Sequence, residues 1–279
     1  SNPDNDELRA HIANLLRESG ELELAEKLLN EATIQTSIIH VARARIQLVY
    51  ADMQRDGTGE TDELHITIAK QSFEMAIELD RELGIAWLGI ARCERLLKNF
   101  EIAKEALDRA SRLLDGESIV YAESALLALD IGDLVEANQL IEAAAVGLED
   151  TALIAYLRGN LDCMNGNFIS ARNHFDDVLE RHDPLHVRAR LNRIATSLAL
   201  GLHDSALDDC RILLEQAPEL TLAKCRMADA LMLVTNWESA KQLWTEILEL
   251  NGNHPHALTQ LAACNIALGI PDQAEAPLN

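Results

Sequence analysis

The most constraining feature of this chain is a single alanine that recurs at a nearly fixed spacing. From Ala69 onward its copies are 34 or 35 residues apart, and the earlier gap, from Ala25 to Ala69, is 44 residues. A small residue repeated at this period indicates a tandem array of one helical unit, in which each copy packs only on its neighbours. The copies are Ala25, Ala69, Ala103, Ala137, Ala171, Ala206, Ala240 and Ala274.

The residues around each alanine follow the period of an α-helix. Apolar side chains recur three positions before it and four and seven positions after it, which places all of them on one helix face. A second helical stretch precedes each copy, as in residues 85–91. Five positions before the alanine we expect a left-handed helix end, which favours glycine. That position holds Gly20, Gly132, Gly166, Gly201 and Gly269, with Lys98 and Thr235 in two other copies. Each unit is therefore helix A, a short turn and helix B.

This pattern resembles the tetratricopeptide repeat (TPR) family, whose unit is a helix hairpin of 34 residues with small residues where helices A and B touch. The clearest copy runs from Gly84 to Asp115, and Pro218 closes another copy where the family favours proline. The resemblance implies an all-α, right-handed superhelix, an α-solenoid with about seven full repeats and a partial eighth. The family positions in the clearest copy are Trp87, Ala91, Phe100, Ala103, Leu107 and Ala110.

We expect residues 1–279 to form a single array of such units. The second unit contains the one long insertion, and its two glycines and four carboxylates predict a mobile loop over residues 55–64, between helices A and B. The predicted units are 6–39, 40–83, 84–117, 118–151, 152–186, 187–220, 221–254 and the partial 255–279.

Composition narrows the classes of partner and location. A net charge of −22 argues against nucleic acid, which needs a dominant basic field. No apolar run is long enough to insert into a membrane. The five cysteines are widely spaced, which favours a reducing, cytoplasmic location, with the periplasm left open because no natural N-terminus is present. The abrupt ends suggest a module of a larger protein, and the irregular copies suggest a bacterial one.

No constellation in the sequence predicts catalysis, a cofactor or a metal. His182 with His186, and His254 with His256, flank turns between units, so we interpret them as polar turn residues. No nucleophile turn or phosphate-binding loop occurs. The carboxylate pairs on helix B are expected to face water; they are Asp176, Asp177, Asp208 and Asp209. We therefore expect a protein that is not an enzyme and needs no cofactor.

Helix A lines the concave groove in the family, and arginine is concentrated on it here. The planar guanidinium suits bidentate capture of carboxylates, so these residues predict a groove for acidic or C-terminal segments of a protein or peptide. The helix-A arginines are Arg43, Arg45, Arg92, Arg95, Arg158, Arg188, Arg190, Arg193 and Arg226.

Some TPR proteins bind a partner's terminal carboxylate through asparagine, lysine and arginine side chains of three successive units. The resemblance places Asn160, Asn192 and Arg226 at the two asparagines and the arginine, but Tyr156 and Leu222 stand where lysines are needed. The clamp is therefore half present. The candidate groove residues are Tyr156, Asn160, Arg188, Asn192 and Arg226. The alternative is that they are ordinary groove-lining residues without a specific ligand.

The function favoured by these observations is a non-catalytic scaffold that binds a protein or peptide in the helix-A groove. One alternative is a regulatory appendage of an enzyme or signalling protein whose catalytic or receiver domain lies elsewhere. Another is a self-assembly module, in which an uncapped C-terminal end packs on a second copy to give a homo-oligomer.

Overall fold

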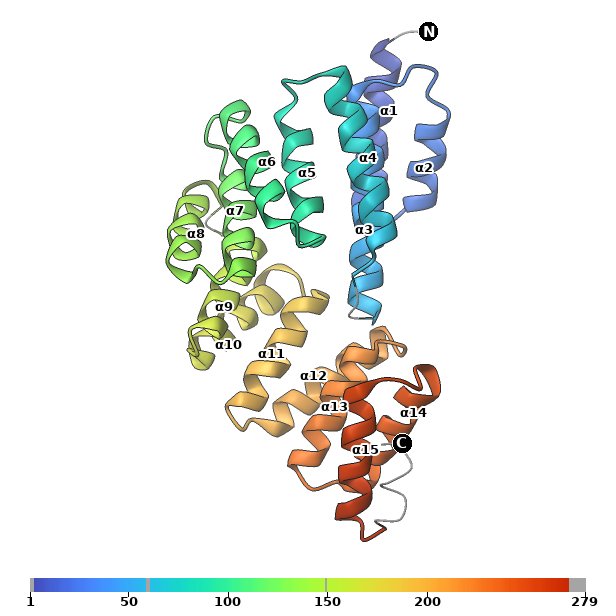
Figure 1. Cartoon of the computed structure of the whole chain (residues 1–279), viewed down its shortest axis with the longest axis vertical. Helices are drawn as coiled ribbons and strands as arrows, with labels where there is room; N and C mark the ends of the chain where they lie inside the picture. Colours follow the sequence, from blue (N-terminus) through green and yellow to red (C-terminus); the bar gives the residue numbers. More distant parts are fainter. Residues whose placement is uncertain (1–2, 59–60, 149, 271–279) are drawn as a thin grey trace. The chain divides into compact units, whose positions relative to one another are not determined.

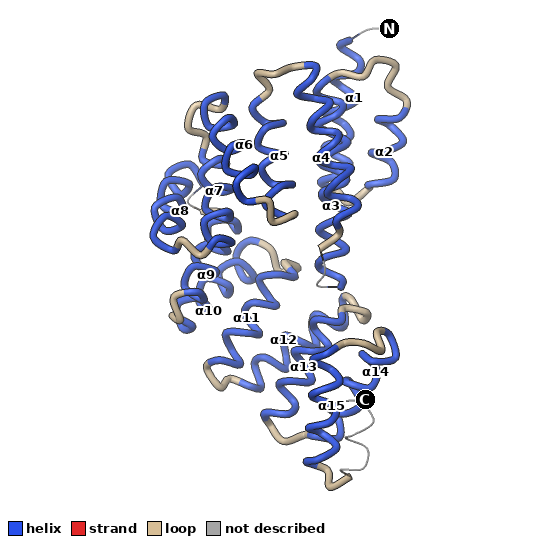
Figure 2. The backbone as a smooth tube through the Cα atoms, in the orientation of Figure 1, coloured by secondary structure: helices blue, strands red, loops and turns tan. Residues whose placement is uncertain are grey.

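The fold of the chain is built from helices alone. The computed structural model describes residues 3–58, 61–148 and 150–270, and within these ranges no strand occurs (Figure 2). Its α-helices, labelled in Figure 1, are α1 (Pro3–Glu18), α2 (Leu22–Asn30), α3 (Ser37–Thr58), α4 (Glu63–Leu79), α5 (Gly84–Leu96), α6 (Phe100–Leu113), α7 (Ser118–Ile131), α8 (Leu134–Leu148), α9 (Ala152–Met164), α10 (Phe168–Asp177), α11 (Val187–Ala199), α12 (His203–Gln216), α13 (Thr221–Leu233), α14 (Trp237–Leu250) and α15 (Pro255–Ala267). A π-helical turn, η1 (Val178–His182), follows α10 directly. The predicted all-α class is confirmed. None of the described helices is long and apolar enough to cross a membrane.

The helices form hairpins in the order that the repeat predicts. Odd-numbered helices up to α13 are helix A and the following even-numbered ones are helix B, while α15 begins the eighth copy. The turn of the fourth hairpin shows the geometry: Gly132 has φ 89°, and the N–H of Asp133 donates to the carbonyl of Ala128 over 2.9 Å. All seven predicted turn residues have positive φ, including Lys98 at 63° and Thr235 at 60°. The left-handed turn is therefore kept even where glycine is missing.

The recurring alanine is the contact point inside each hairpin. Seven of its copies, from Ala25 to Ala240, have no solvent exposure, as predicted. Ala274 lies outside the described residues. Interhelical contacts are equally close elsewhere: a Cβ built on Gly89 of α5 would lie 2.3 Å from Cζ of Phe73 on α4. Because an added methyl group there has no room, the small residues set how closely neighbouring helices approach.

The chain divides into two compact units. The first comprises residues 1–55 and 60–157, and the second comprises residues 158–279 and 56–59. In the first unit, one apolar cluster joins α1, α2 and α3 around Leu29 and Ile39. A second cluster joins α3 to α7 around Phe73 and Ile90. In the second unit, the corresponding clusters run through α11 to α15 around Cys210 and Trp244. Each cluster joins consecutive hairpins, so stability is shared between neighbours rather than gathered in one core.

The insertion in the second hairpin mostly lengthens its helices. The prediction of a loop over residues 55–64 is wrong at both ends, because α3 continues through Thr58 and α4 begins at Glu63. An ion pair one turn apart, Arg55 to Asp52 at 3.1 Å, supports the extension of α3. Asp62 caps α4 by accepting a hydrogen bond from the N–H of His65. Residues 59–60 lie outside the described part of the chain.

The fifth hairpin ends in a π-helical turn. At η1 the N–H of Asp183 donates to the carbonyl of Val178 over 2.8 Å, a bond that spans five residues instead of four. Val178 stands where most copies carry a second alanine, and it is fully buried. The chain then turns at Asp183 and Pro184 into α11, as predicted from the sequence.

Candidate functional site

Four of the five candidate groove residues lie in the second unit, on successive helices A. Asn160 is on α9, Arg188 and Asn192 are on α11, and Arg226 is on α13; all four are partly exposed. Nδ2 of Asn192 donates to Oδ1 of Asn160 over 2.7 Å, so the two asparagines bridge adjacent helices. Tyr156 lies one turn before Asn160 on α9 and is also partly exposed, but it belongs to the first unit.

The bridge leaves hydrogen-bonding groups unused on both asparagines. Asn160 retains its amide N–H donors and Asn192 its carbonyl oxygen, since neither side chain has another hydrogen-bond partner within the described residues. A donor beside an acceptor matches the N–H and C=O of an extended peptide backbone. Arg226, at the position equivalent to Asn192 in the next unit, makes no hydrogen bond or ion pair to the described residues. The face therefore offers a polar backbone-reading pair and a guanidinium.

Two arginines predicted to line the groove are instead part of a buried ion-pair network. Asp209 of α12 is only 2% exposed and accepts hydrogen bonds from Nη1 of Arg190 at 2.9 Å and Nε of Arg193 at 2.8 Å. Arg193 also reaches Asp176 of α10 at 2.7 Å, and Arg190 reaches the carbonyl of Pro184 at 2.6 Å. The expectation that Asp209 faces water is therefore wrong. Asp209 lies next to the buried face of α12 and points at the neighbouring α11, where Arg190 and Arg193 donate hydrogen bonds to its carboxylate.

The network also fixes the charge state of its central arginine. Burial by itself would lower the pKa of Arg193, but hydrogen bonds and charge attraction from Asp209 and Asp176 outweigh it and raise the pKa. Other helix-A arginines are engaged as well: Arg43 donates to the carbonyl of Leu29 at 3.0 Å, and Arg95 to Asp130 at 2.8 Å. Most of the arginine on this face therefore links neighbouring helices, and Arg226 is an exception.

The histidines at the turns have structural partners. His186 and His254 are the N-caps of α11 and α15, where Nδ1 accepts from the N–H of Ala189 at 3.1 Å and of Ala257 at 3.2 Å. The interpretation as turn residues is thus supported for His186 and His254, whereas His182 is the last residue of η1 and His256 lies in the first turn of α15. Among the described residues no group of three metal-ligating side chains comes together.

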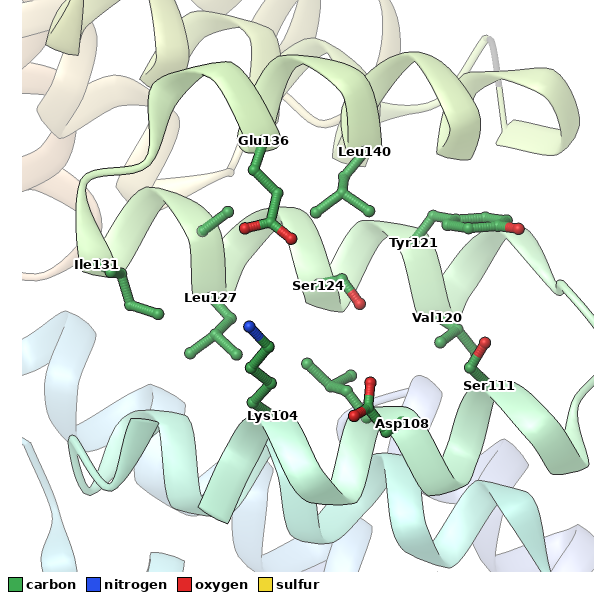
Figure 3. A pocket seen from close by; sticks show the side chains of 12 residues that line it. Lys104, Asp108, Ser111, Val120, Tyr121, Ser124, Leu127, Ile131, Glu136 and Leu140 are labelled. Atoms are coloured by element: carbon green, nitrogen blue, oxygen red, sulfur yellow. The ribbon is translucent and has the colours of Figure 1, made fainter. Parts of the chain in front are cut away.

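A pocket that the sequence did not predict lies between α6, α7 and α8. Its volume is about 210 Å³, and Figure 3 shows Lys104 and Glu136 pointing toward one another above Leu127. Because the apolar residues of α7 do not gather on a single helix face, its periodicity does not reveal which residues stay uncovered. The lining residues are Lys104, Leu107, Asp108, Ser111, Val120, Tyr121, Ser124, Leu127, Ala128, Ile131, Glu136 and Leu140.

Comparison with known proteins gives the same architecture. The tetratricopeptide repeat family model matches residues 156–220. A chain of the APC/C hetero-tetramer Cut9–Hcn1 is similar in structure, with 18% identity, a TM-score of 0.75 and coverage of 90% of this chain and 48% of that chain. Yeast Tom70 shows 15% identity, a TM-score of 0.60 and coverage of 99% and 58%. A tetratricopeptide repeat protein from Parabacteroides merdae ATCC 43184 shows 12% identity, a TM-score of 0.58 and coverage of 94% and 99%. No curated protein matches the sequence.

The fold and its partly exposed helix-A faces define a helical-repeat protein of the kind that binds other chains. At these identities the structural likeness concerns the fold, and the chain spans about half the length of the Cut9–Hcn1 chain that it matches. With the family match over residues 156–220 and seven hairpins in phase, the chain has the tetratricopeptide repeat fold.

Proposed function

We propose that this protein is a non-catalytic scaffold that holds an extended peptide segment of a partner protein along α9, α11 and α13. The proposal is supported by one observation above the others, the Asn160–Asn192 bridge with its unused donor and acceptor. Asparagine pairs bind backbone amides without demanding a sequence, and Arg226 would add attraction to an acidic side chain or a terminal carboxylate.

The experiment compares capture of partners from the source cell by the wild-type protein and two double variants. Asn192→Ala/Arg226→Ala removes the backbone-reading pair and the guanidinium. Asn173→Ala/Arg211→Ala makes the same two chemical changes at exposed positions of the helix-B surface, on α10 and α12. We expect the first variant to lose partners that the second retains, and the captured amount to fall as salt rises, because an open face is screened. Equal retention by both variants would place the binding surface elsewhere.

Self-assembly is a second candidate function. Ile266 on α15 is 63% exposed, and Leu250 at the end of α14 is 60% exposed, so apolar surface is available near this end of the described chain. A homo-oligomer would appear as a concentration-dependent mass in light scattering, and Ile266→Ser would return it to the monomer mass. A monomer mass at all concentrations would remove this candidate.

We propose that the chain is a module of a larger bacterial, cytoplasmic protein. The alternative role for this module is that of a regulatory appendage of an enzyme or signalling protein. The thiols agree with a reducing compartment, since all five cysteines are free and four are buried.

A further inference from the structure

Three arginines from three consecutive helices A meet in one pocket of the first unit. Arg17 comes from the last turn of α1, Arg45 from α3 and Arg92 from α5. Together with Leu48, Val49 and Asp52 they line a pocket of about 280 Å³. The residues lie about one repeat apart or more in sequence, so only the stacking of hairpins brings their side chains together.

The carboxylates at this pocket do not match its guanidinium groups. Asp52 accepts from Arg92 at 2.7 Å and from Arg55 at 3.1 Å, and the 63% exposed Glu18 pairs with Arg17 at 2.7 Å. The pocket itself is lined by three guanidinium groups and one carboxylate. Arg45 makes no hydrogen bond or ion pair within the described part of the chain. The buried Nε of Arg17 likewise has no partner.

Holding this excess of positive charge costs the folded state stability. Burial lowers the pKa of Arg45, and repulsion from Arg17 lowers it further, with only partial compensation from Glu18. The contrast lies in the second unit, where the buried Arg190 and Arg193 converge on Asp209. A single buried Nε without a partner also occurs in Arg190, so the distinguishing feature of the pocket is Arg45, whose whole guanidinium group lacks a partner among the described residues. An arginine in that state in a pocket is typical of a binding site.

We propose that the Arg17–Arg45–Arg92 pocket binds the carboxylate groups of an acidic segment in a partner protein. Arginine forks engage carboxylates in bidentate geometry, and the apolar Leu48 and Val49 suit the methylene groups of a glutamate side chain. A long polyanion such as nucleic acid is disfavoured, because the net charge of −22 repels it beyond this local patch. The kind of partner rests on the proposed scaffold function. The Arg17–Arg45–Arg92 pocket belongs to the first unit, whereas Asn160, Asn192 and Arg226 belong to the second.

The test uses a fluorescent hexaglutamate peptide with blocked ends, and hexaglutamine as the neutral control. Binding is followed by fluorescence anisotropy for wild type, Arg45→Gln and Arg112→Gln. Arg112 is exposed on α6, so its variant makes the same change of charge in the same unit away from the pocket. We expect Arg45→Gln to weaken hexaglutamate binding about tenfold or more, as expected for loss of a charge-assisted contact. Arg112→Gln should bind as wild type does, and Arg45→Gln should leave any binding of hexaglutamine unchanged.

A stability measurement separates binding from a structural role. Because Arg45→Gln removes a repelled, unpaired charge, its melting temperature should equal or exceed that of wild type. A lower melting temperature with unchanged peptide binding would overturn the proposal, as would equal loss of binding in Arg112→Gln. Binding of inorganic phosphate in place of hexaglutamate would also overturn it.

A double-variant background separates the pocket from the groove in the second unit, which can also attract an acidic peptide. Arg45→Gln should weaken hexaglutamate binding by the same factor in the Asn192→Ala/Arg226→Ala background as in wild type. If Asn192→Ala/Arg226→Ala loses the peptide while Arg45→Gln retains it, the acidic segment binds at the groove proposed above and the pocket proposal fails. If no partner is captured at that groove and Arg45→Gln still loses hexaglutamate, the pocket stands without it.

Discussion

Replacing Asp209 with asparagine tests whether the buried ion-pair network holds α10, α11 and α12 together. Asparagine keeps the shape of the side chain but removes its charge, while Arg190 and Arg193 remain with side chains only 8% and 14% exposed. Arg193 keeps Asp176 at 2.7 Å and Arg190 keeps the carbonyl of Pro184, so the loss is partial. Breaking a buried ion pair on one side costs about 3–5 kcal/mol, and we expect about 3 kcal/mol here.

The neighbouring residue supplies the matched control. Asp208 is one position earlier on α12, pairs with the exposed Arg211 and has a side chain 68% exposed. Since exposed ion pairs contribute about 0–1 kcal/mol, Asp208→Asn should change the unfolding free energy by less than about 0.5 kcal/mol. The same chemical change at adjacent positions should thus give effects that differ several-fold.

The assay combines urea unfolding with hydrogen exchange followed by mass spectrometry. Because units in a repeat array depend mainly on their neighbours, faster exchange should concentrate in α10 to α13 and spare α1 to α6. The double variant Arg190→Leu/Asp209→Leu should recover part of the lost stability, since apolar replacement of a buried pair is often neutral but Arg193 still loses Asp209. If Asp209→Asn and Asp208→Asn unfold at the same urea concentration, the network does not stabilise the hairpins and the reasoning is refuted.

Three further predictions concern packing, pH and thiol chemistry. Gly89→Ala should lower the unfolding free energy by about 1–3 kcal/mol in urea titrations, because the new methyl group would meet the ring of Phe73 at 2.3 Å. Burial works to raise the pKa of Asp62, but hydrogen bonds from His65 outweigh it and lower the pKa. The cap at the start of α4 should therefore contribute fully above about pH 4 and be lost as the pH falls through the folded pKa. The measurement is the protection of α4 amides relative to their intrinsic exchange rates at each pH, and Asp62→Asn should remove the pH dependence of that protection. Burial raises the pKa of the Cys93 thiol to about 12, so iodoacetamide at pH 8 should label it slowly in the native protein and rapidly in urea; rapid native labelling would contradict its burial.

The repeat could be predicted from the sequence because its signals are local. The alanine spacing fixes which residues share a helix face, and the left-handed positions mark the turns even at Lys98 and Thr235. The extension of α3 was missed because glycines and carboxylates indicate a loop only on average, whereas here the Asp52–Arg55 pair continues the helix.

The candidate site was harder to predict, since it depends on contacts between hairpins. Periodicity places Asp208 and Asp209 together on helix B but does not show which of them the neighbouring arginines reach. The excess charge around Arg45 was also hidden, because Arg17 lies in another repeat and its side chain enters the pocket only through stacking. The family resemblance suggested Asn160 and Asn192 as groove residues, but it did not predict the hydrogen bond between them.

The π-helical turn after α10 explains an irregularity in the spacing of the alanines. The gap from Ala171 to Ala206 is 35 residues where its neighbours are 34, and Val178–His182 holds one residue more per turn than an α-helix does. The surplus residue is thus absorbed inside helix B, before the turn at Asp183, and the next hairpin begins in phase. A one-residue insertion in a helical array can in this way persist as a local change of winding, without shifting the packing surface of any unit that follows.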